Sequence, residues 1–463
     1  MTMRVMSGLE ILGPHAAPVD AVLRAALAAV APQAAVQAHL QVLGETLRVG
    51  PRRASGRAVT HDLRRGRVFL LGVGKAAYPM TRAAWETVAP WVADCLVVTK
   101  DGYAGPTWPG CTVLQAGHPV PDARSLAAAH AAQALLRRAG PHDVVLVLLS
   151  GGGSALLTWP VPGVSLADLQ TLTQALLASG ATIHEINAVR KHLDRVKGGG
   201  LALWAAPARV VTLALSDVLG DDPSVIASGP TVADPSTFAE AWAVLARYGL
   251  TEALPPGVRA HLQAGLAGRV PETPKPGDPR LQNSAWFVVG SVRHAAEAAA
   301  TAARQQGWHA GLLTTTLQGE AREAGRVLAA VLQEMARLDR PWPRPGCALA
   351  GGETTVTLGP NPGRGGRNQE LALAATPLLA GLPGVALVAF ATDGTDGPTD
   401  AAGAVVTSQT LARARALGLD PRAHLARHDA YAFFDQVGGL LRPGPTRTNV
   451  NDLVLLCTWR DEA

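Results

Sequence analysis

Short apolar runs alternate with segments of helical periodicity along this chain. Four runs predict buried strands: Val68–Val73, Cys95–Val98, Val144–Leu149 and Val210–Leu215. Helical spacing of apolar residues follows them at 76–88, 125–138 and 166–178. This alternation is typical of a parallel sheet with helices on both faces.

Two further segments shape the predicted organisation. Apolar residues from Pro18 to about Leu47 recur at helical spacing, which predicts a helical lead. The proline-rich stretch Pro255–Pro279 should not continue a helix or a central strand, so we place a domain boundary near its end. Beyond it, strands are expected at 285–289, 310–315, 348–349, 385–391 and 453–457, and helices at 295–306 and 321–335. We therefore expect two α/β domains, 1–280 and 281–463.

Composition narrows the class of protein. Of 463 residues, 48% are hydrophobic and 17% are charged, a globular balance. The net charge of +5 is not gathered into long basic blocks, so nucleic acid is not an expected partner. The four cysteines have no CxxC spacing, and no apolar run reaches the roughly 20 residues of a membrane span. We expect a cytoplasmic protein with no membrane segment.

Glycine-rich turns follow several predicted strands, and in doubly wound sheets ligands bind beyond the carboxyl ends of strands. The first turn, Gly72–Ala77 (GVGKAA), lacks Walker A spacing and fits a dinucleotide fingerprint only loosely, with no acidic residue closing a second strand about 20 residues on. Lys75 opens a helix there, a position that is unfavourable for a cation unless an anion offsets its charge. A tight turn with a solvated lysine is the alternative.

Two more turns carry possible anion contacts. Ser150–Ala155 (SGGGSA) could wrap an anion with backbone N–H groups, although a flexible junction would look the same. Asn187–Gly200 (NAVRKHLDRVKGGG) predicts a charged helix that ends at a glycine triplet. Arg190 and Lys191 are weak candidates there, since Asp194 could pair with Arg190 at helical spacing.

Acidic residues and an arginine follow later strands. Asp217 lies in the turn Leu215–Thr231, and clustered carboxylates beyond a strand suit Mg²⁺, although aspartate is also a common turn residue. The turn 391–400 carries Asp393 and Asp396, whose spacing does not match an EF-hand and leaves a magnesium or substrate-hydroxyl role open. Arg367, in GRGGRNQE, could fork onto a transferring phosphoryl group.

Taken together, an ordered set of motifs from about Leu71 to Val454 resembles the type II glycerate kinases. The set comprises GVGKAA, GHPVPD, SGGGSALL, INAVRKHL, VKGGGLA, LSDVLGDDPSVIASGPT, GGETTVTL, GRGGRNQELAL, ATDGTDGPTDAAGA and TNVNDL. The resemblance implies an N-terminal Rossmann-like doubly wound sheet, a smaller C-terminal α/β domain of the leucine-rich (MOFRL) type, and an active site in the interdomain cleft. It also implies transfer of the γ-phosphoryl group of ATP to D-glycerate with Mg²⁺, typically at the 2-hydroxyl to give 2-phosphoglycerate.

The resemblance carries over two essential residues, Lys75 and Arg367, and we expect Asp217 to act with them as a catalytic group. Substrate or nucleotide contacts are expected from Gly74, Ser150, Gly151, Gly152, Gly153, Ser154, Arg190, Lys191, Glu353, Asn368 and Asn451. Metal ligands are expected from Asp217, Asp393 and Asp396. The chain departs from the family at Arg447, where glycine is expected, and His118 receives no role.

Two rival functions stay open. The GVGKAA turn and the kinship of substrates also suit an NAD(P)H-dependent hydroxypyruvate reductase, and a non-catalytic sugar-acid sensor would need the same cleft. The sequence leaves undecided which hydroxyl is phosphorylated, which aspartate is the general base, and whether the chain forms a homodimer.

Overall fold

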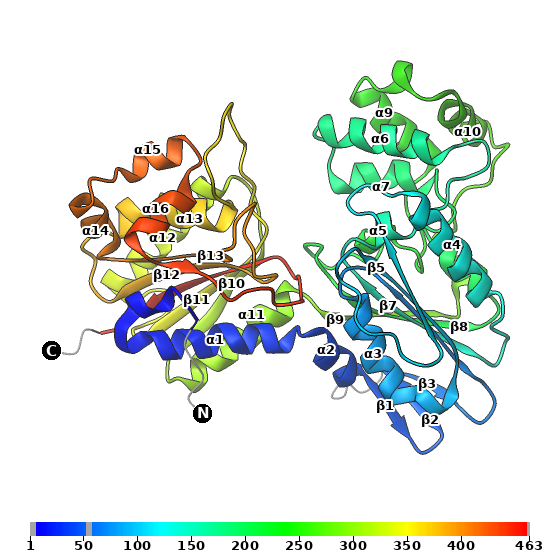
Figure 1. Cartoon of the computed structure of the whole chain (residues 1–463), viewed down its shortest axis with the longest axis horizontal. Helices are drawn as coiled ribbons and strands as arrows, with labels where there is room; N and C mark the ends of the chain where they lie inside the picture. The colour runs from blue at the N-terminus through cyan, green and yellow to red at the C-terminus, as the bar shows by residue number, and fades with distance from the viewer. Residues whose placement is uncertain (1–5, 52–57, 461–463) are drawn as a thin grey trace. The chain divides into compact units, whose positions relative to one another are not determined.

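The computed structural model describes residues 6–51 and 58–460. They divide into two compact units, each with its own sheet and apolar core (Figure 1). The N-terminal unit comprises Pro32–Ser216 and Asp221–Val289. The C-terminal unit comprises 6–31, Asp217–Gly220 and 290–460.

A six-stranded sheet organises the N-terminal unit, in the order β6-β5-β4-β7-β8-β9. Its strands are β4 (Val68–Val73), β5 (Val92–Lys100), β6 (Cys111–Ala116), β7 (Val144–Ser150), β8 (Arg209–Leu215) and β9 (Ser284–Gly290). The pairs β4–β5, β4–β7, β5–β6 and β7–β8 are parallel. Numbered from β4, this order is the 3-2-1-4-5-6 of the Rossmann fold, whose switch point lies between the first and fourth strands, here β4 and β7.

The strand predictions follow from burial on both faces. Every residue of β4 and β7 is buried, which is why each reads as a continuous apolar run. The helices α3 (Ala77–Val88) and α4 (Ala123–Leu136) pack against this sheet. The predicted doubly wound N-terminal sheet is confirmed.

Four helices form a separate cluster beyond the sheet, as Figure 1 shows. They are α6 (Leu166–Ala178), α7 (Ile183–Lys191), α9 (Phe238–Arg247) and α10 (Pro256–Leu266). Their shared core includes Leu176, Val189, Leu245 and Leu262, which are fully buried. Two short helices, α5 (Gly153–Leu156) and α8 (Gly200–Ala205), connect the cluster to the sheet region.

Two helix predictions in this region are wrong. The stretch Pro255–Pro279 contains α10, because Pro256 occupies the first helical turn, where its missing N–H costs nothing. The charged helix ends at Lys191, well before the glycine triplet. Asp194 then pairs with Lys197 at 2.6 Å and not with Arg190.

The helical lead is also shorter than predicted. It divides into α1 (Ala16–Ala29) and α2 (Pro32–His39), followed by β1 (Leu40–Leu43) and β2 (Thr46–Val49). These strands form an antiparallel hairpin around Gly44, whose φ of +61° suits the tight turn. With β3 (Val59–Asp62) they make a small three-stranded sheet.

The C-terminal unit has a mixed sheet in the order β10-β11-β15-β12-β13-β14. Its strands are β10 (His309–Leu317), β11 (Gly346–Gly352), β12 (Val385–Ala391), β13 (Gly403–Thr407), β14 (Leu440–Leu441) and β15 (Asp452–Thr458). Among the described strands of this sheet, only β10 and β11 pair in parallel, and the other pairs are antiparallel.

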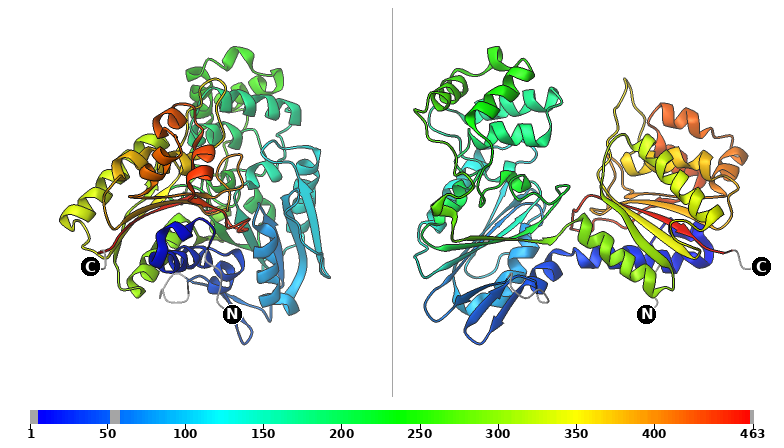
Figure 2. Two further views of the ribbon diagram at one scale, coloured as in Figure 1. Left: turned by 60° about the vertical axis from the view of Figure 1, so that its left-hand side comes forward. Right: turned by 180° about the vertical axis from the view of Figure 1, so that it is seen from behind.

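Helices cover both faces of this second sheet. Figure 2 shows α1 and α11 (Val292–Gln305) on one face and α12 (Ala321–Leu338), α13 (Arg367–Leu379) and α16 (Ala430–Val437) on the other. The short helices α14 (Thr410–Ala416) and α15 (Pro421–Ala426) lie beside α16. The predicted second α/β layer is confirmed.

The two compact units do not coincide with the predicted domains, 1–280 and 281–463. The first helix, α1, packs against α11 in the C-terminal unit, and β9 completes the N-terminal sheet. Among the described residues, no single helix is long and apolar enough to cross a bilayer. Only the pair 9–29 and 32–39, bent by 57°, satisfies length and composition together.

Candidate active site

The switch point of the N-terminal sheet brings the GVGKAA and SGGGSA turns together. Gly74, with φ +128°, lies so close to β7 that a Cβ there would be 2.3 Å from Ser150 Oγ. The Lys75 N–H donates to the Gly151 carbonyl at 2.9 Å, and the Ala76 N–H donates to Ser150 Oγ at 2.9 Å. The Ser150 side chain therefore links the two turns by a hydrogen bond.

Backbone conformation shapes the glycine turn after β7. Gly152 adopts φ +86°, and a Cβ there would lie 3.4 Å from Lys75 Cγ. A Cβ at Gly153 would lie 3.0 Å from Ala227 Cβ. Among the described residues, Lys75 Nζ makes no hydrogen bond or ion pair. The turn thus presents backbone N–H groups and an uncommitted ammonium group, which together suit an anion.

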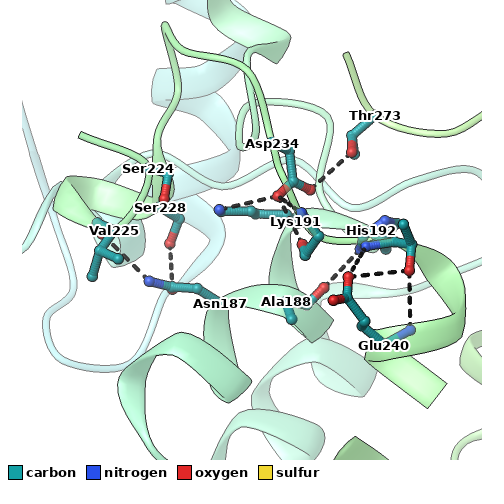
Figure 3. Close-up of polar contacts among 12 residues, drawn as sticks. Asn187, Ala188, Lys191, His192, Ser224, Val225, Ser228, Asp234, Glu240 and Thr273 are labelled. Carbon is teal, nitrogen blue, oxygen red and sulfur yellow. Dashed lines mark hydrogen bonds and ion pairs between the residues drawn. The ribbon is translucent and has the colours of Figure 1, made fainter. Parts of the chain in front are cut away.

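Ser154 connects this turn to the helical cluster. Its hydroxyl lies 2.8 Å from Ser228 Oγ, which donates to Asn187 Oδ1 at 2.8 Å. Figure 3 shows Asn187 reaching Ser228 and also Val225, whose carbonyl accepts its amide at 3.4 Å. Ser228 adopts φ +62°, a left-handed conformation that non-glycine residues rarely take. The hydrogen bonds to Ser154 and Asn187 hold the hydroxyl in place beside the turn.

Lys191 and Arg190 differ in their surroundings. Lys191 is 4% exposed and pairs at 3.1 Å with Asp234, which also accepts from Thr273 (Figure 3). Its charge is thus balanced inside the protein, beside a cavity of about 380 Å³ between α7 and α9. Arg190 makes no hydrogen bond or ion pair among the described residues, and burial lowers its pKa, opposed by Asp194. Of the two, Arg190 has the charge that an anion could use.

A second cluster surrounds Arg367 in the C-terminal unit. Strand pairing explains it, because Asp452 at the start of β15 faces both Gly352, the last residue of β11, and Ala391, the last residue of β12. Arg367 Nε donates to Asp452 Oδ2 at 2.5 Å and Nη2 donates to Oδ1 at 3.2 Å.

Glu353 completes this cluster from beyond β11. Its Oε1 lies 2.7 Å from Arg367 Nη1, and its Oε2 accepts from Asn451 Nδ2 at 2.9 Å. Burial lowers the pKa of Arg367, but Asp452 and Glu353 more than offset this and raise it above its usual value. Burial raises the pKa of Asp452 to about 6, with Arg367 opposing the shift. The predicted residues Arg367, Glu353 and Asn451 therefore form one network.

Asp396 caps the helix that carries Arg367. Its two carboxylate oxygens accept the backbone N–H groups of Asn368 at 3.2 Å and Gln369 at 2.9 Å. Burial and the nearby Asp452 raise the pKa of Asp396 to about 7. Both oxygens are engaged within the protein, so this carboxyl fits a capping role better than that of a magnesium ligand.

Asp393 and Asp217 are the other expected metal ligands, and both are half-buried. Asp393 is half-buried and one oxygen, Oδ1, accepts the Thr395 N–H at 2.9 Å. Asp217 lies in the short segment assigned to the C-terminal unit. Within residues 6–51 and 58–460, no group of three or more His, Cys, Asp or Glu is arranged to hold a metal. Mg²⁺ needs only one or two carboxylates besides water and phosphate oxygens, so Asp393 and Asp217 fit that donor chemistry.

Two structural features were not visible from sequence patterns. Asp452 lies in the TNVNDL motif, but its role depends on strand pairing across about 100 residues, from β11 to β15, which no local pattern indicates. Arg447 adopts φ +63°, a conformation that glycine adopts easily, so the backbone there keeps the shape that the expected glycine would have.

Asp101 bears on the dinucleotide alternative. It follows β5 directly, in the region where a ribose-binding acid would lie, although none was expected from sequence. Arg124 holds both of its carboxylate oxygens, at 2.7 and 2.8 Å. This acid is therefore engaged with a neighbouring guanidinium group.

The fold and the two clusters define a two-unit α/β enzyme class with a Rossmann-order sheet. Family models match both parts: "Domain of unknown function (DUF4147)" over residues 18–263 and "MOFRL family" over residues 346–452. A glycerate 2-kinase of Pyrococcus horikoshii is 46% identical over 391 residues, covering 84% of this chain and 87% of that protein. The chain belongs to the type II glycerate kinase family.

Two other similar proteins complete the comparison. The crystal structure of a glycerate kinase from Thermotoga maritima matches with a TM-score of 0.83 at 41% identity, covering 94% of this chain and 97% of that one. A protein of Agrobacterium vitis, provisionally named as a hydroxypyruvate reductase, is 47% identical over 399 residues, covering 84% of this chain and 86% of that protein. Relatives of this chain are thus named both as glycerate kinases and as a hydroxypyruvate reductase.

Proposed function

We propose that this protein phosphorylates D-glycerate with ATP, giving 2-phosphoglycerate. The observation that carries the proposal is similarity along 84% of the chain to a glycerate 2-kinase, at 46% identity. Lys75 and Arg367, the two cations expected to act, both lie beside glycine-rich turns: Lys75 follows β4, and Arg367 begins α13. The cytoplasm is the proposed compartment.

Phosphoryl transfer mainly requires that charge be neutralised and that the reacting groups be positioned. Lys75 and the N–H groups of the Gly151–Ser154 turn would bind phosphate oxygens. Arg367, fixed by Asp452 and Glu353, would bind a second anionic group, either a phosphate or the glycerate carboxylate. Mg²⁺, held by Asp393 and Asp217, would neutralise phosphate charge.

Replacement of each cation tests this proposal. Lys75→Ala or Arg367→Ala should lower kcat/KM for glycerate by about 10²–10³-fold, because each removes a donor to developing charge. ADP release measures the rate, and circular dichroism verifies folding. Arg326→Ala is the matched control, because Arg326 is exposed and, among the described residues, pairs only with Glu323 on α12. Near-wild-type rates in both folded variants would reject these roles.

A hydroxypyruvate reductase is the second candidate, favoured by the Rossmann strand order and by the name of the Agrobacterium relative. The pairing of Asp101 with Arg124 disfavours it, because a ribose would have to displace that guanidinium group. Incubation of the protein with hydroxypyruvate and NADH or NADPH decides the matter. Loss of nicotinamide absorbance without ADP release in the kinase assay would establish the reductase.

A further inference from the structure

His118 lies at the glycine turn beside Lys75, yet the proposed mechanism so far gives it no task. It follows β6 in the GHPVPD motif. A Cβ at Gly152 would lie 2.9 Å from His118 Cδ2 and 3.1 Å from His118 Nε2. The same Cβ would lie 3.4 Å from Lys75 Cγ. The imidazole and the lysine stem therefore both pack on Gly152, where the missing side chain leaves room for them.

The turn that carries His118 is held without using its ring nitrogens. Asp122 caps α4 by accepting the N–H groups of Arg124 and Ser125 at 2.9 and 3.2 Å. Asp122 is in turn held by the Arg124 guanidinium, and its carboxylate would lie 2.8 Å from a Cβ on Gly117. In the part of the chain that the structure describes, neither ring nitrogen of His118 has a hydrogen-bond partner. Both nitrogens are available to a ligand.

The charges around His118 keep its ring neutral. Burial, Lys75 and Lys100 lower its pKa to about 4. Lys75 follows β4 and Lys100 ends β5, so the two cations approach from separate strands of the sheet. No carboxylate is among the groups that shift it. A neutral imidazole can accept a proton, whereas a protonated one cannot.

An anion at Lys75 would change this balance. Phosphate oxygens bound there would offset the positive field of the lysines, and the pKa of His118 would rise toward its ordinary value near 6.5. The imidazole would then become a stronger base when the phosphoryl donor is bound. Bound phosphates would thus prepare His118 for proton transfer.

We propose that His118 is the catalytic base that takes the proton of the attacking glycerate hydroxyl. The inference rests on the proposed kinase function. In the step, the O–H bond of glycerate breaks and its proton moves to a ring nitrogen of His118. The glycerate oxygen forms a bond to the γ-phosphorus, and the bond from that phosphorus to the bridging oxygen breaks, its electron pair leaving with ADP. The imidazolium then releases the proton to solvent.

The test compares His118→Asn with the wild type at saturating ATP and glycerate. General base catalysis typically contributes about 10²–10⁴-fold, so kcat should fall by that factor while the KM for ATP changes by less than about threefold. His261→Asn is the matched control: His261 is half-buried on α10 with a pKa also lowered by burial, and this variant should keep the wild-type kcat. Melting temperatures establish that the variants are folded.

Chemical rescue separates a catalytic base from a structural histidine. In His118→Ala, added imidazole should restore kcat in proportion to the concentration of its neutral form, and it should have no effect on Lys75→Ala. A kcat within threefold of the wild type in His118→Asn, or the absence of rescue in folded His118→Ala, would overturn the proposal. Wild-type protein without kinase activity would instead refute the underlying function.

Discussion

At the residue scale, Arg367 shows how a half-buried cation can be held and still bind an anion. Asp452 takes Nε and one N–H of Nη2, and Glu353 pairs with Nη1. A guanidinium has five N–H donors, so at least one N–H on each Nη remains for a ligand. Two carboxylates on one arginine fix its plane, which favours bidentate binding of a carboxylate or phosphate.

Asp396 gives a prediction for stability against pH. Its pKa is about 7 in the folded protein against an ordinary value of 3.8, so its stabilising effect is full below about pH 4 and is lost as the pH rises through 7. Asp396→Asn should therefore gain stability relative to the wild type between pH 5 and 8. Urea unfolding at each pH measures the difference in free energy of unfolding.

The change of that difference with pH is the critical result. Asparagine keeps one oxygen for the N–H of Gln369 or Asn368 and carries no charge at any pH. A difference that stays constant from pH 5 to 8, or one that favours the wild type increasingly at high pH, would mean that Asp396 does not carry a raised pKa.

Sequence patterns identified the site residues that the backbone conformation requires, such as glycines, better than the residues whose side chains meet at the site. Gly74 and Gly152 could be predicted because the tight turns that follow β4 and β7 need residues with a positive φ, which glycine adopts easily. Asp452 and His118 could not, since each becomes a site residue only through strands distant in sequence. The cysteines illustrate the same limit: Cys95 lies directly opposite Cys111 across β5 and β6, which their spacing did not indicate.

At the scale of elements, buried strands were the most predictable feature. The run Val68–Val73 coincides with β4 because a central parallel strand is apolar on both faces. The helix predicted from Pro18 to Leu47 is wrong after His39, because the alternation of apolar and polar residues in Leu40–Val49 belongs to a β-hairpin. Pro256 lies in the stretch expected to break helices, yet it begins α10, because proline is well tolerated in the first helical turn.

The start of α13 gives a prediction at this scale. Gly366 precedes the helix in ordinary extended backbone, φ −152°, and a Cβ there would lie 2.3 Å from Asp396 Cγ. Gly366→Ala should push the helix start away from its capping carboxylate and cost about 1–3 kcal/mol. Thermal and urea unfolding measure the loss.

Gly359 provides the matched control for that substitution. A Cβ there would meet nothing within 4 Å, so Gly359→Ala should change the free energy of unfolding by less than about 0.5 kcal/mol. Equal stabilities for Gly366→Ala and Gly359→Ala would contradict the close approach of Gly366 to Asp396.

At the scale of the whole molecule, the chain distributes its functional groups over two units. Lys75, His118 and the glycine turn belong to the N-terminal unit, and Arg367 with its carboxylates belongs to the C-terminal unit. The two-unit α/β organisation could be predicted from the alternation of elements. The membership of α1 in the C-terminal unit could not, because an amphipathic helix does not specify which sheet its apolar face will cover.

The most direct test of the central claim is the identity of the reaction product. Purified protein incubated with D-glycerate, ATP and Mg²⁺ should give 2-phosphoglycerate, recognised by phosphorus NMR through coupling of the phosphorus to the single C2 proton, with ADP formed in equal amount. Phosphorylation at the 3-hydroxyl would correct the position of transfer. No phosphorylated product, with nicotinamide consumed on hydroxypyruvate instead, would contradict the kinase assignment.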